Sequence, residues 1–223
     1  MGSAIGELLP LALGIAISPI PIIAAILMLL SLKAQGTSVG FLLGWVVGVV
    51  LVVVVFTALS SVIPQSPAGQ SQPIVGIIKL VLGLGLLVLA VGQWRGRPKE
   101  GVKPTLPAWM SAIDSMTAFR GFVIGFLLAG LNPKNLLIGA SAGIALGSDS
   151  QSIGSDAIAT VIYALIAAST VGIPVIGNLF AAQQMRVPLQ KLHIWLLNNN
   201  ATVMATLLLI IGVVVIAKGI SSF

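Results

Sequence analysis

The sequence predicts an all-α polytopic membrane protein with six transmembrane helices, arranged as two inverted three-helix repeats. Three observations predict it: the composition, six long apolar runs, and paired proline breaks in the first and fourth runs. Of the 223 residues, 57% are hydrophobic and 7% are charged, and the mean hydropathy is +1.13. Soluble domains carry about 25% charged residues, so the composition indicates a multi-pass membrane protein.

Six apolar runs are long enough to span a bilayer, because a spanning helix needs about 20 mostly apolar residues. The predicted domains are a first repeat at 1–94, a basic cytoplasmic linker at 95–118 and a second, inverted repeat at 119–223. Pro107 opens a linker segment that is either an amphipathic surface helix or a packed connector. The runs are Ile5–Leu32, Val39–Ile63, Ile74–Trp94, Phe119–Leu146, Ile153–Phe180 and Ala201–Ile220.

The basic residues predict the orientation. With the N-terminus outside, the outer side holds only Lys79 and Lys218, which can reach the interface by snorkelling. The cytoplasmic side then holds most of the positive charge, so both termini are predicted outside the plasma membrane. Glu7 and Asp156 fit interfacial charges near helix ends. The cytoplasmic cations would be Lys33, Arg95, Arg97, Lys99, Lys103, Arg120, Arg186 and Lys191. Loop charges of this kind explain the pI near 10.2 without any binding of nucleic acid.

A polar interruption, Asn132-Pro133-Lys134-Asn135, lies near the middle of the fourth run. An ionisable group at that depth costs roughly 2.5–3.5 kcal/mol on insertion scales, which indicates a purpose. Ser18-Pro19-Ile20-Pro21 interrupts the first run at a corresponding place. Three helices per half is an odd number, so the halves must insert in opposite orientations. Paired interruptions in inverted halves predict a binding site at the membrane midplane.

Two roles are open for Lys134. Its ammonium could hold an anionic headgroup or carboxylate, or it could bind carbonyls that the nearby prolines free. The neutral polar side chains could either cap half-helices or contact substrate. With no carboxylate at the midplane, the site favours an anion over a cation or metal. The predicted substrate-binding residues are Lys134, Asn132, Asn135 and Ser18, and the predicted helix breakers are Pro19, Pro21 and Pro133.

Small residues recur every four positions in the second and fifth runs and predict close helix packing. They are Gly40, Gly44 and Gly48, and Ala164, Ala168 and Gly172. Contact between these two faces within one protomer is favoured, and a homodimer stays open. Cysteine is absent and there is one histidine, so no metal site or cofactor is expected. No nucleophile or paired-carboxylate arrangement is visible, so the protein is not expected to be an enzyme.

Four blocks resemble the GAP family of GPL-addressing proteins, which includes the sulfolipid-addressing protein Sap, within the LysE superfamily of exporters. They are S-P-I-P at 18–21, L-A-V-G-Q-W-R-G-R-P-K at 89–99, P-A-W-M-S-A-I-D-S at 107–115 and G-F-L-L-A-G-L-N-P-K-N at 125–135. The resemblance implies six helices in two inverted repeats. It also implies a role in moving or presenting cell-envelope glycolipids, with lipid-synthesis and large lipid-transport proteins as partners.

The predicted function is a transporter, or a transport-accessory protein, for an amphipathic glycolipid with an acidic headgroup near Lys134. One alternative is a small-solute exporter like the amino-acid branch of the LysE superfamily. An amino-acid substrate would need a carboxylate of the protein to pair with its ammonium group. The other alternative is a non-transporting scaffold for lipid-synthesis and export machinery, whose working surface would include the loop Arg95–Lys103.

Overall fold

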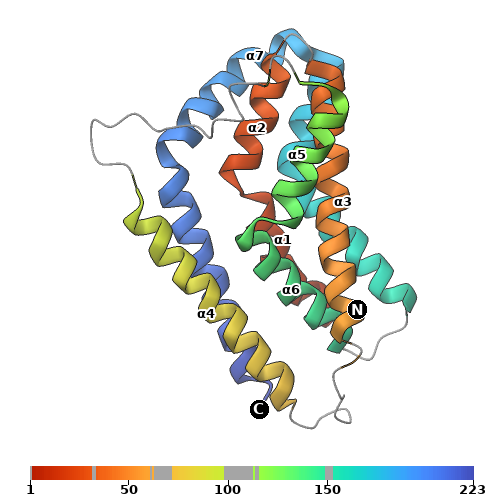
Figure 1. Cartoon of the computed structure of the whole chain (residues 1–223), viewed down its shortest axis with the longest axis vertical. Coiled ribbons are helices and arrows are strands. Elements are labelled where there is room, and N and C mark those ends of the chain that lie inside the picture. The colour runs from red at the N-terminus through yellow and green to blue at the C-terminus, as the bar shows by residue number, and fades with distance from the viewer. Residues whose placement is uncertain are drawn as a thin grey trace.

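The structure is a computed structural model that describes residues 2–31, 34–60, 62, 72–97, 113, 116–148 and 153–223. Within these ranges the chain forms seven α-helices and no strand (Figure 1). Most of the predicted linker at 95–118, including most of the segment that opens at Pro107, lies outside the described residues, and Ile113 and Met116 of that segment are buried. The helices are α1 (Gly2–Ala16), α2 (Pro19–Leu30), α3 (Ala34–Ser60), α4 (Pro73–Arg95), α5 (Ala118–Gly130), α6 (Pro133–Ser148) and α7 (Ile153–Ile220).

The first and fourth apolar runs are each folded as two helices with a sharp bend between them. The α1–α2 pair bends by 52°, and the α5–α6 pair bends by 64°. In each pair the second helix begins at a proline, Pro19 or Pro133. Proline fits the first turn of a helix, but it cannot donate the N–H that would continue the preceding one. The bends therefore follow from the local sequence.

The glycine face of α3 packs against α5. A Cβ atom at Gly40 or Gly44 would overlap the carbonyl oxygen of Ala118 or Phe122, and one at Gly48 would lie 2.7 Å from the Ala129 Cβ atom. Such contacts require glycine, because the helix backbones touch. This face was predicted to meet the fifth run, and the structure gives it another partner.

The physical reason is that α5 carries matching glycines. Gly121 and Gly125 face the α3 backbone just as closely, so two smooth faces meet. In the fifth run, by contrast, a Cβ atom at Gly172 would be in ordinary contact with Leu42 of α3, at 3.6 Å. Ala164 and Ala168 are buried on α7. They contribute to the core rather than to a glycine-mediated contact.

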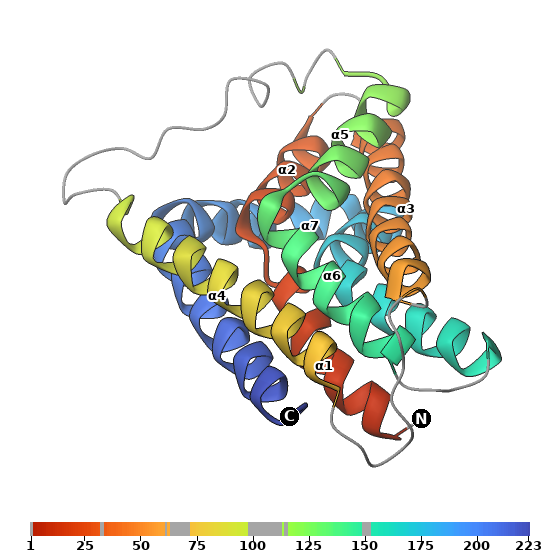
Figure 2. The same cartoon turned by 60° about the horizontal axis from the view of Figure 1, so that its bottom comes forward.

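α4 packs along the C-terminal part of α7, also through glycines. A Cβ atom at Gly83 would lie 2.9 Å from the carbonyl oxygen of Gly212, and one at Gly219 would lie 3.0 Å from that of Gly76. Figures 1 and 2 show this pair as one side of the molecule. The other side holds α1, α2, α3, α5, α6 and the N-terminal part of α7.

α7 is 68 residues long and includes both the fifth and sixth apolar runs. At 1.5 Å per residue, a straight helix of that length would extend about 100 Å, roughly three times the thickness of a bilayer core. Ala181 has a non-helical backbone conformation (φ −142°, ψ 46°). Figure 1 shows α7 rising on one side, turning over the top and descending beside α4.

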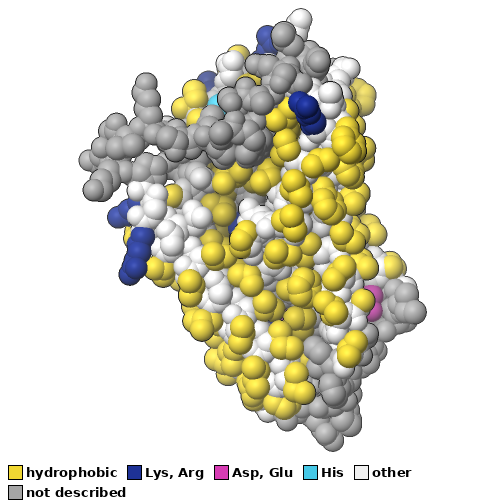
Figure 3. All heavy atoms as spheres, in the orientation of Figure 1, with side chains coloured by type: hydrophobic (Ala, Val, Ile, Leu, Met, Phe, Trp, Pro, Cys, Tyr) yellow, Lys and Arg dark blue, Asp and Glu magenta, His cyan; other side chains and the backbone are white. Residues whose placement is uncertain are grey.

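Within the described residues, three helices are long and apolar enough to cross a membrane. The number rises to five when each bent pair is taken as one span. Six spans and an inverted repeat are not confirmed by these criteria. Large apolar side chains such as Val81, Leu165 and Ile173 are more than 60% exposed. Figure 3 shows apolar side chains over most of one face, as expected of a multi-pass membrane protein.

Candidate functional site

The two broken helices meet at Lys134 and Ser18. Lys134 lies in the first turn of α6 and is 3% exposed. Because a helical side chain leans toward the N-terminus of its helix, Lys134 reaches back past the start of α6. Its Nζ atom donates a hydrogen bond to Ser18 Oγ, at 2.5 Å. The structure therefore joins the two predicted interruptions, which are 116 residues apart in sequence, through a side-chain contact.

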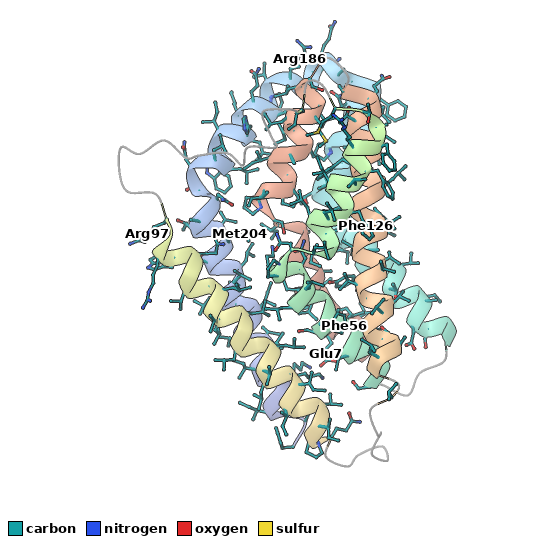
Figure 4. All side chains as sticks on the ribbon, viewed as in Figure 1. Glu7, Phe56, Arg97, Phe126, Arg186 and Met204 are labelled. Carbon is teal, nitrogen blue, oxygen red and sulfur yellow. The ribbon has the colours of Figure 1, made fainter. Side chains whose placement is uncertain are left out.

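Met204, from the C-terminal part of α7, also contacts this ammonium group through its thioether sulfur. Its Sδ atom lies 3.9 Å from Lys134 Nζ, and the side chain is buried. Figure 4 shows Met204 about midway along the molecule. We call Lys134, Ser18 and Met204 the Lys134 centre. Three helical segments thus contribute to it: the α1–α2 junction, the start of α6, and α7.

The ammonium of Lys134 is incompletely satisfied by the protein. It carries three N–H donors, and it has one hydroxyl and one weakly accepting thioether as partners. Among the described residues, the ion pairs join Glu7 to Lys79 and to Lys218, and none involves Lys134. A buried cation without a counter-ion is costly, and a carboxylate, sulfate or phosphate group would relieve that cost.

The two asparagines act as helix caps. Asn132 Oδ1 accepts a hydrogen bond from the backbone N–H of Lys134 at 3.1 Å, at the start of α6. Asn135 Nδ2 donates to the carbonyl of Leu128 at 2.9 Å, near the end of α5. Asn135 Oδ1 is buried and has no protein partner. Asn132 and Asn135 therefore shape the break, and Asn135 also presents one unused acceptor.

The end of α1 is capped in a similar way by Thr170 of α7, whose Oγ1 donates to the carbonyl of Ala16. Thr170 and Asn135 therefore donate hydrogen bonds to carbonyls at the ends of α1 and α5, and Lys134 donates to neither of these carbonyls. Sequence reasoning missed both Thr170 and Met204. Threonine is common within membrane helices and methionine is apolar, so neither carried a signal.

Helix ends of both signs meet at the Lys134 centre, because α1 ends at Ala16 and α5 at Gly130, so the net positive charge comes from the ammonium group. α2 and α6 both begin beside it, at Pro19 and Pro133. The N-terminal end of a helix carries roughly +0.5 of an elementary charge, and the ammonium adds one more. Helix N-termini bind anions for this reason. Within the described ranges, no group of three or more His, Cys, Asp or Glu residues could hold a metal ion.

A second charged cluster is centred on Glu7, which Figure 4 shows below Met204 in that view. Glu7 Oε1 lies 3.3 Å from Lys79 Nζ and 3.9 Å from Lys218 Nζ. We call these three residues the Glu7 cluster. Lys79 is 8% exposed and its ammonium pairs with Glu7, and its reach to the interface stays a prediction. Its aliphatic stem is buried at the α4–α7 pair and its charge is neutralised by Glu7.

Comparison with known proteins gives one match. The sequence model of the family described as "Sap, sulfolipid-1-addressing protein" matches residues 8–221, which include both helix breaks and the Lys134 centre. No curated protein and no solved structure matches the chain.

Proposed function

The chain belongs to the Sap, sulfolipid-1-addressing protein, family, and on that premise we propose that it moves cell-envelope glycolipids across the plasma membrane. It does so alone or as an accessory to larger lipid-synthesis and lipid-transport proteins. The cargo is an amphipathic lipid with an acidic headgroup. The proposed role is non-catalytic and needs no cofactor.

The observation that carries this proposal is the ammonium of Lys134. It is 3% exposed, bonded to a hydroxyl across two broken helices, and without an acid partner in the described part of the chain. A structural tie between the helices could use a neutral residue at lower cost. A buried positive charge at two helix N-termini is suited to an acidic headgroup, whose charge it would neutralise.

The proposed architecture is six spans in two inverted repeats, with both termini outside. Two features support it. The bent pairs α1–α2 and α5–α6 break at corresponding prolines and contact each other at their breaks. α7 is too long for one crossing and contains a non-helical residue at Ala181, between its two apolar runs. Each half would then contribute one broken helix and two unbroken ones.

The chemistry of the site favours this proposal over an amino-acid exporter. Such a substrate brings its own ammonium group and would need a carboxylate beside Lys134. Of the acids in the described residues, Glu7 is already paired with Lys79 and Lys218. The scaffold alternative places the function in the Arg95–Lys103 loop, so it predicts a different set of damaging substitutions.

The test is glycolipid export in cells that carry Lys134→Met, which keeps the chain length and apolar stem but removes the charge. We expect surface glycolipid to fall to background while the protein inserts normally. Lys191→Met is the matched control, because it removes one exposed cation from the surface of α7. Normal export by Lys134→Met, together with lost export on replacing Arg95 and Arg97, would favour the scaffold and contradict the proposal.

A further inference from the structure

The Glu7 cluster is more than a surface ion pair. Lys79 is 8% exposed, and the Glu7 side chain is 22% exposed. Lys218 keeps 52% of its side chain exposed, with its Nζ atom 3.9 Å from the shared carboxylate oxygen. Two cations thus share one anion, which leaves one net positive charge. A third partner of negative charge would complete the neutralisation.

The cluster lines a cavity of about 20 Å³ among α1, α4, α6 and α7. That volume holds about one water molecule, so a lipid headgroup could not enter while the Glu7 carboxylate is in place. The rest of the lining is mostly apolar and suits the chain region of an amphiphile. The other lining residues are Leu11, Ser141, Ala145, Val214 and Val215.

The cavity lies on the same face of α6 as the Lys134 centre. Ser141, which lines the cavity, follows Lys134 by seven residues on α6. Seven residues are about two helical turns, or roughly 10 Å, and return to the same face of a helix. The two cationic sites are therefore successive positions along one face of α6.

We infer that the Glu7 cluster is a second binding site for the acidic headgroup of an anionic amphiphile, in which Glu7 is an exchangeable internal counter-ion. The headgroup displaces the Glu7 carboxylate and binds Lys79 and Lys218 in its place. The carboxylate neutralises one of the two positive charges between binding events. This inference rests on the proposed function for the chemical class of its ligand, and it adds a second site to the Lys134 centre.

The direction in which Glu7→Gln changes ligand binding distinguishes an exchangeable counter-ion from a structural ion pair. If Glu7 competes with the ligand, Glu7→Gln removes the competitor and binding tightens. If the pair is structural, the same change leaves two close cations without a counter-ion and gives no specific gain. Lys79→Gln and Lys218→Gln should each weaken binding, because each removes one of the two cationic partners.

The experiment measures binding of sulfated galactosylceramide to the purified full-length protein in detergent, with unsulfated galactosylceramide as the neutral probe. We expect Glu7→Gln to tighten binding of the sulfated lipid by about tenfold, and Lys79→Gln and Lys218→Gln to weaken it by about tenfold, as expected for charges 3–4 Å apart. Asp156→Asn is the matched control, since it changes the net charge equally outside the cavity lining. Glu7→Asp, whose side chain is one methylene shorter, should tighten binding by a smaller factor. This variant replaces Glu7→Gln in the experiment if Glu7→Gln does not fold.

Unchanged or weaker binding by both Glu7 variants would overturn the inference, and so would equal tightening by Asp156→Asn. The same binding measurement is made with inorganic sulfate. If inorganic sulfate binds as tightly as the sulfated lipid, the assignment of a lipid as the ligand is overturned. The gain from Glu7→Gln should persist when Lys134→Met is added. A failure of the Lys134 centre is therefore distinguishable from a failure of the Glu7 cluster.

Discussion

The two cationic regions of this molecule, the Glu7 cluster and the Lys134 centre, differ in how their positive charge is balanced. In the Glu7 cluster, a carboxylate within 3.9 Å of two ammonium groups neutralises one of their two positive charges. In the Lys134 centre, the ammonium has a hydroxyl and a thioether as neighbours and no acid partner among the described residues. The comparison teaches that burial alone does not define a binding site. A missing counter-ion distinguishes a site that waits for an anion from one that already holds it.

Reversing the charge at the Lys134 centre should have the largest effect. Lys134→Glu places a negative charge beside two helix N-termini, where it would be well stabilised but would repel an acidic headgroup. We expect anionic-lipid binding to fall by more than about 100-fold, equivalent to roughly 3 kcal/mol. Lys191→Glu is the control, and binding of the sulfated lipid by both variants gives the measurement. Equal losses in the two variants would show that the effect is not local.

Making the Lys134 centre resemble the Glu7 cluster should have the next largest effect. Met204→Glu would place a carboxylate within reach of Lys134 Nζ, which now lies 3.9 Å from the Met204 sulfur. The new internal counter-ion should compete with the ligand and weaken anionic-lipid binding by about tenfold, or 1.4 kcal/mol. Met204→Gln keeps the shape without the charge and should bind nearly as the unaltered protein does. Similar binding by both variants would contradict the comparison.

Breaking the ion pair of the Glu7 cluster should have a moderate effect on stability. Glu7→Gln removes a partly buried pair, and we expect the Tm to fall by roughly 2–4 °C for each kcal/mol lost in a chain of this size. Thermal unfolding in detergent measures this shift, with Asp156→Asn beside it. A fall in Tm combined with tighter lipid binding is the pattern that sets an exchangeable counter-ion apart from a structural one.

Removing the hydroxyl that accepts from Lys134 should have the smallest effect on function. Ser18→Ala leaves the ammonium in place but takes away its best protein acceptor, at a cost of about 1–3 kcal/mol in stability. Binding of the anionic lipid should change by less than about threefold, because the charge is retained. A loss as large as that of Lys134→Met would show that Ser18 itself binds the ligand.

The local sequence predicted the two helix breaks, because proline removes a helical N–H, although Pro10, Pro174 and Pro188 lie inside α1 and α7. Pro19 and Pro133 each begin a helix after a sharp bend. The partner of the glycine face could not be predicted in the same way. The second run carries a periodic stripe, but two helices with matching small residues were available, and only packing selects between α5 and α7. The same limit applies to Lys79, whose carboxylate partner is 72 residues away.

Two of the three residues of the Lys134 centre were predictable from the sequence, and their contacts were not. Lys134 and Ser18 were both chosen because they interrupt apolar runs, and the fold places them in direct contact. Met204 and Thr170 lie in ordinary apolar or small-residue surroundings, so nothing in the sequence marks them. The capping roles of Asn132 and Asn135 depend on where each helix ends, which is fixed by the tertiary bend.

The most direct test of the central claim is the preference of the purified protein for sulfated over unsulfated galactosylceramide, measured with and without the charge of Lys134. The account predicts that the unaltered protein prefers the sulfated lipid by about tenfold or more, equivalent to at least 1.4 kcal/mol. Lys134→Met should lower that preference, with the remainder due to the Glu7 cluster, and Lys191→Met should keep it in full. An equal preference in the Lys134→Met variant and the unaltered protein would contradict the claim that this buried ammonium binds the acidic headgroup.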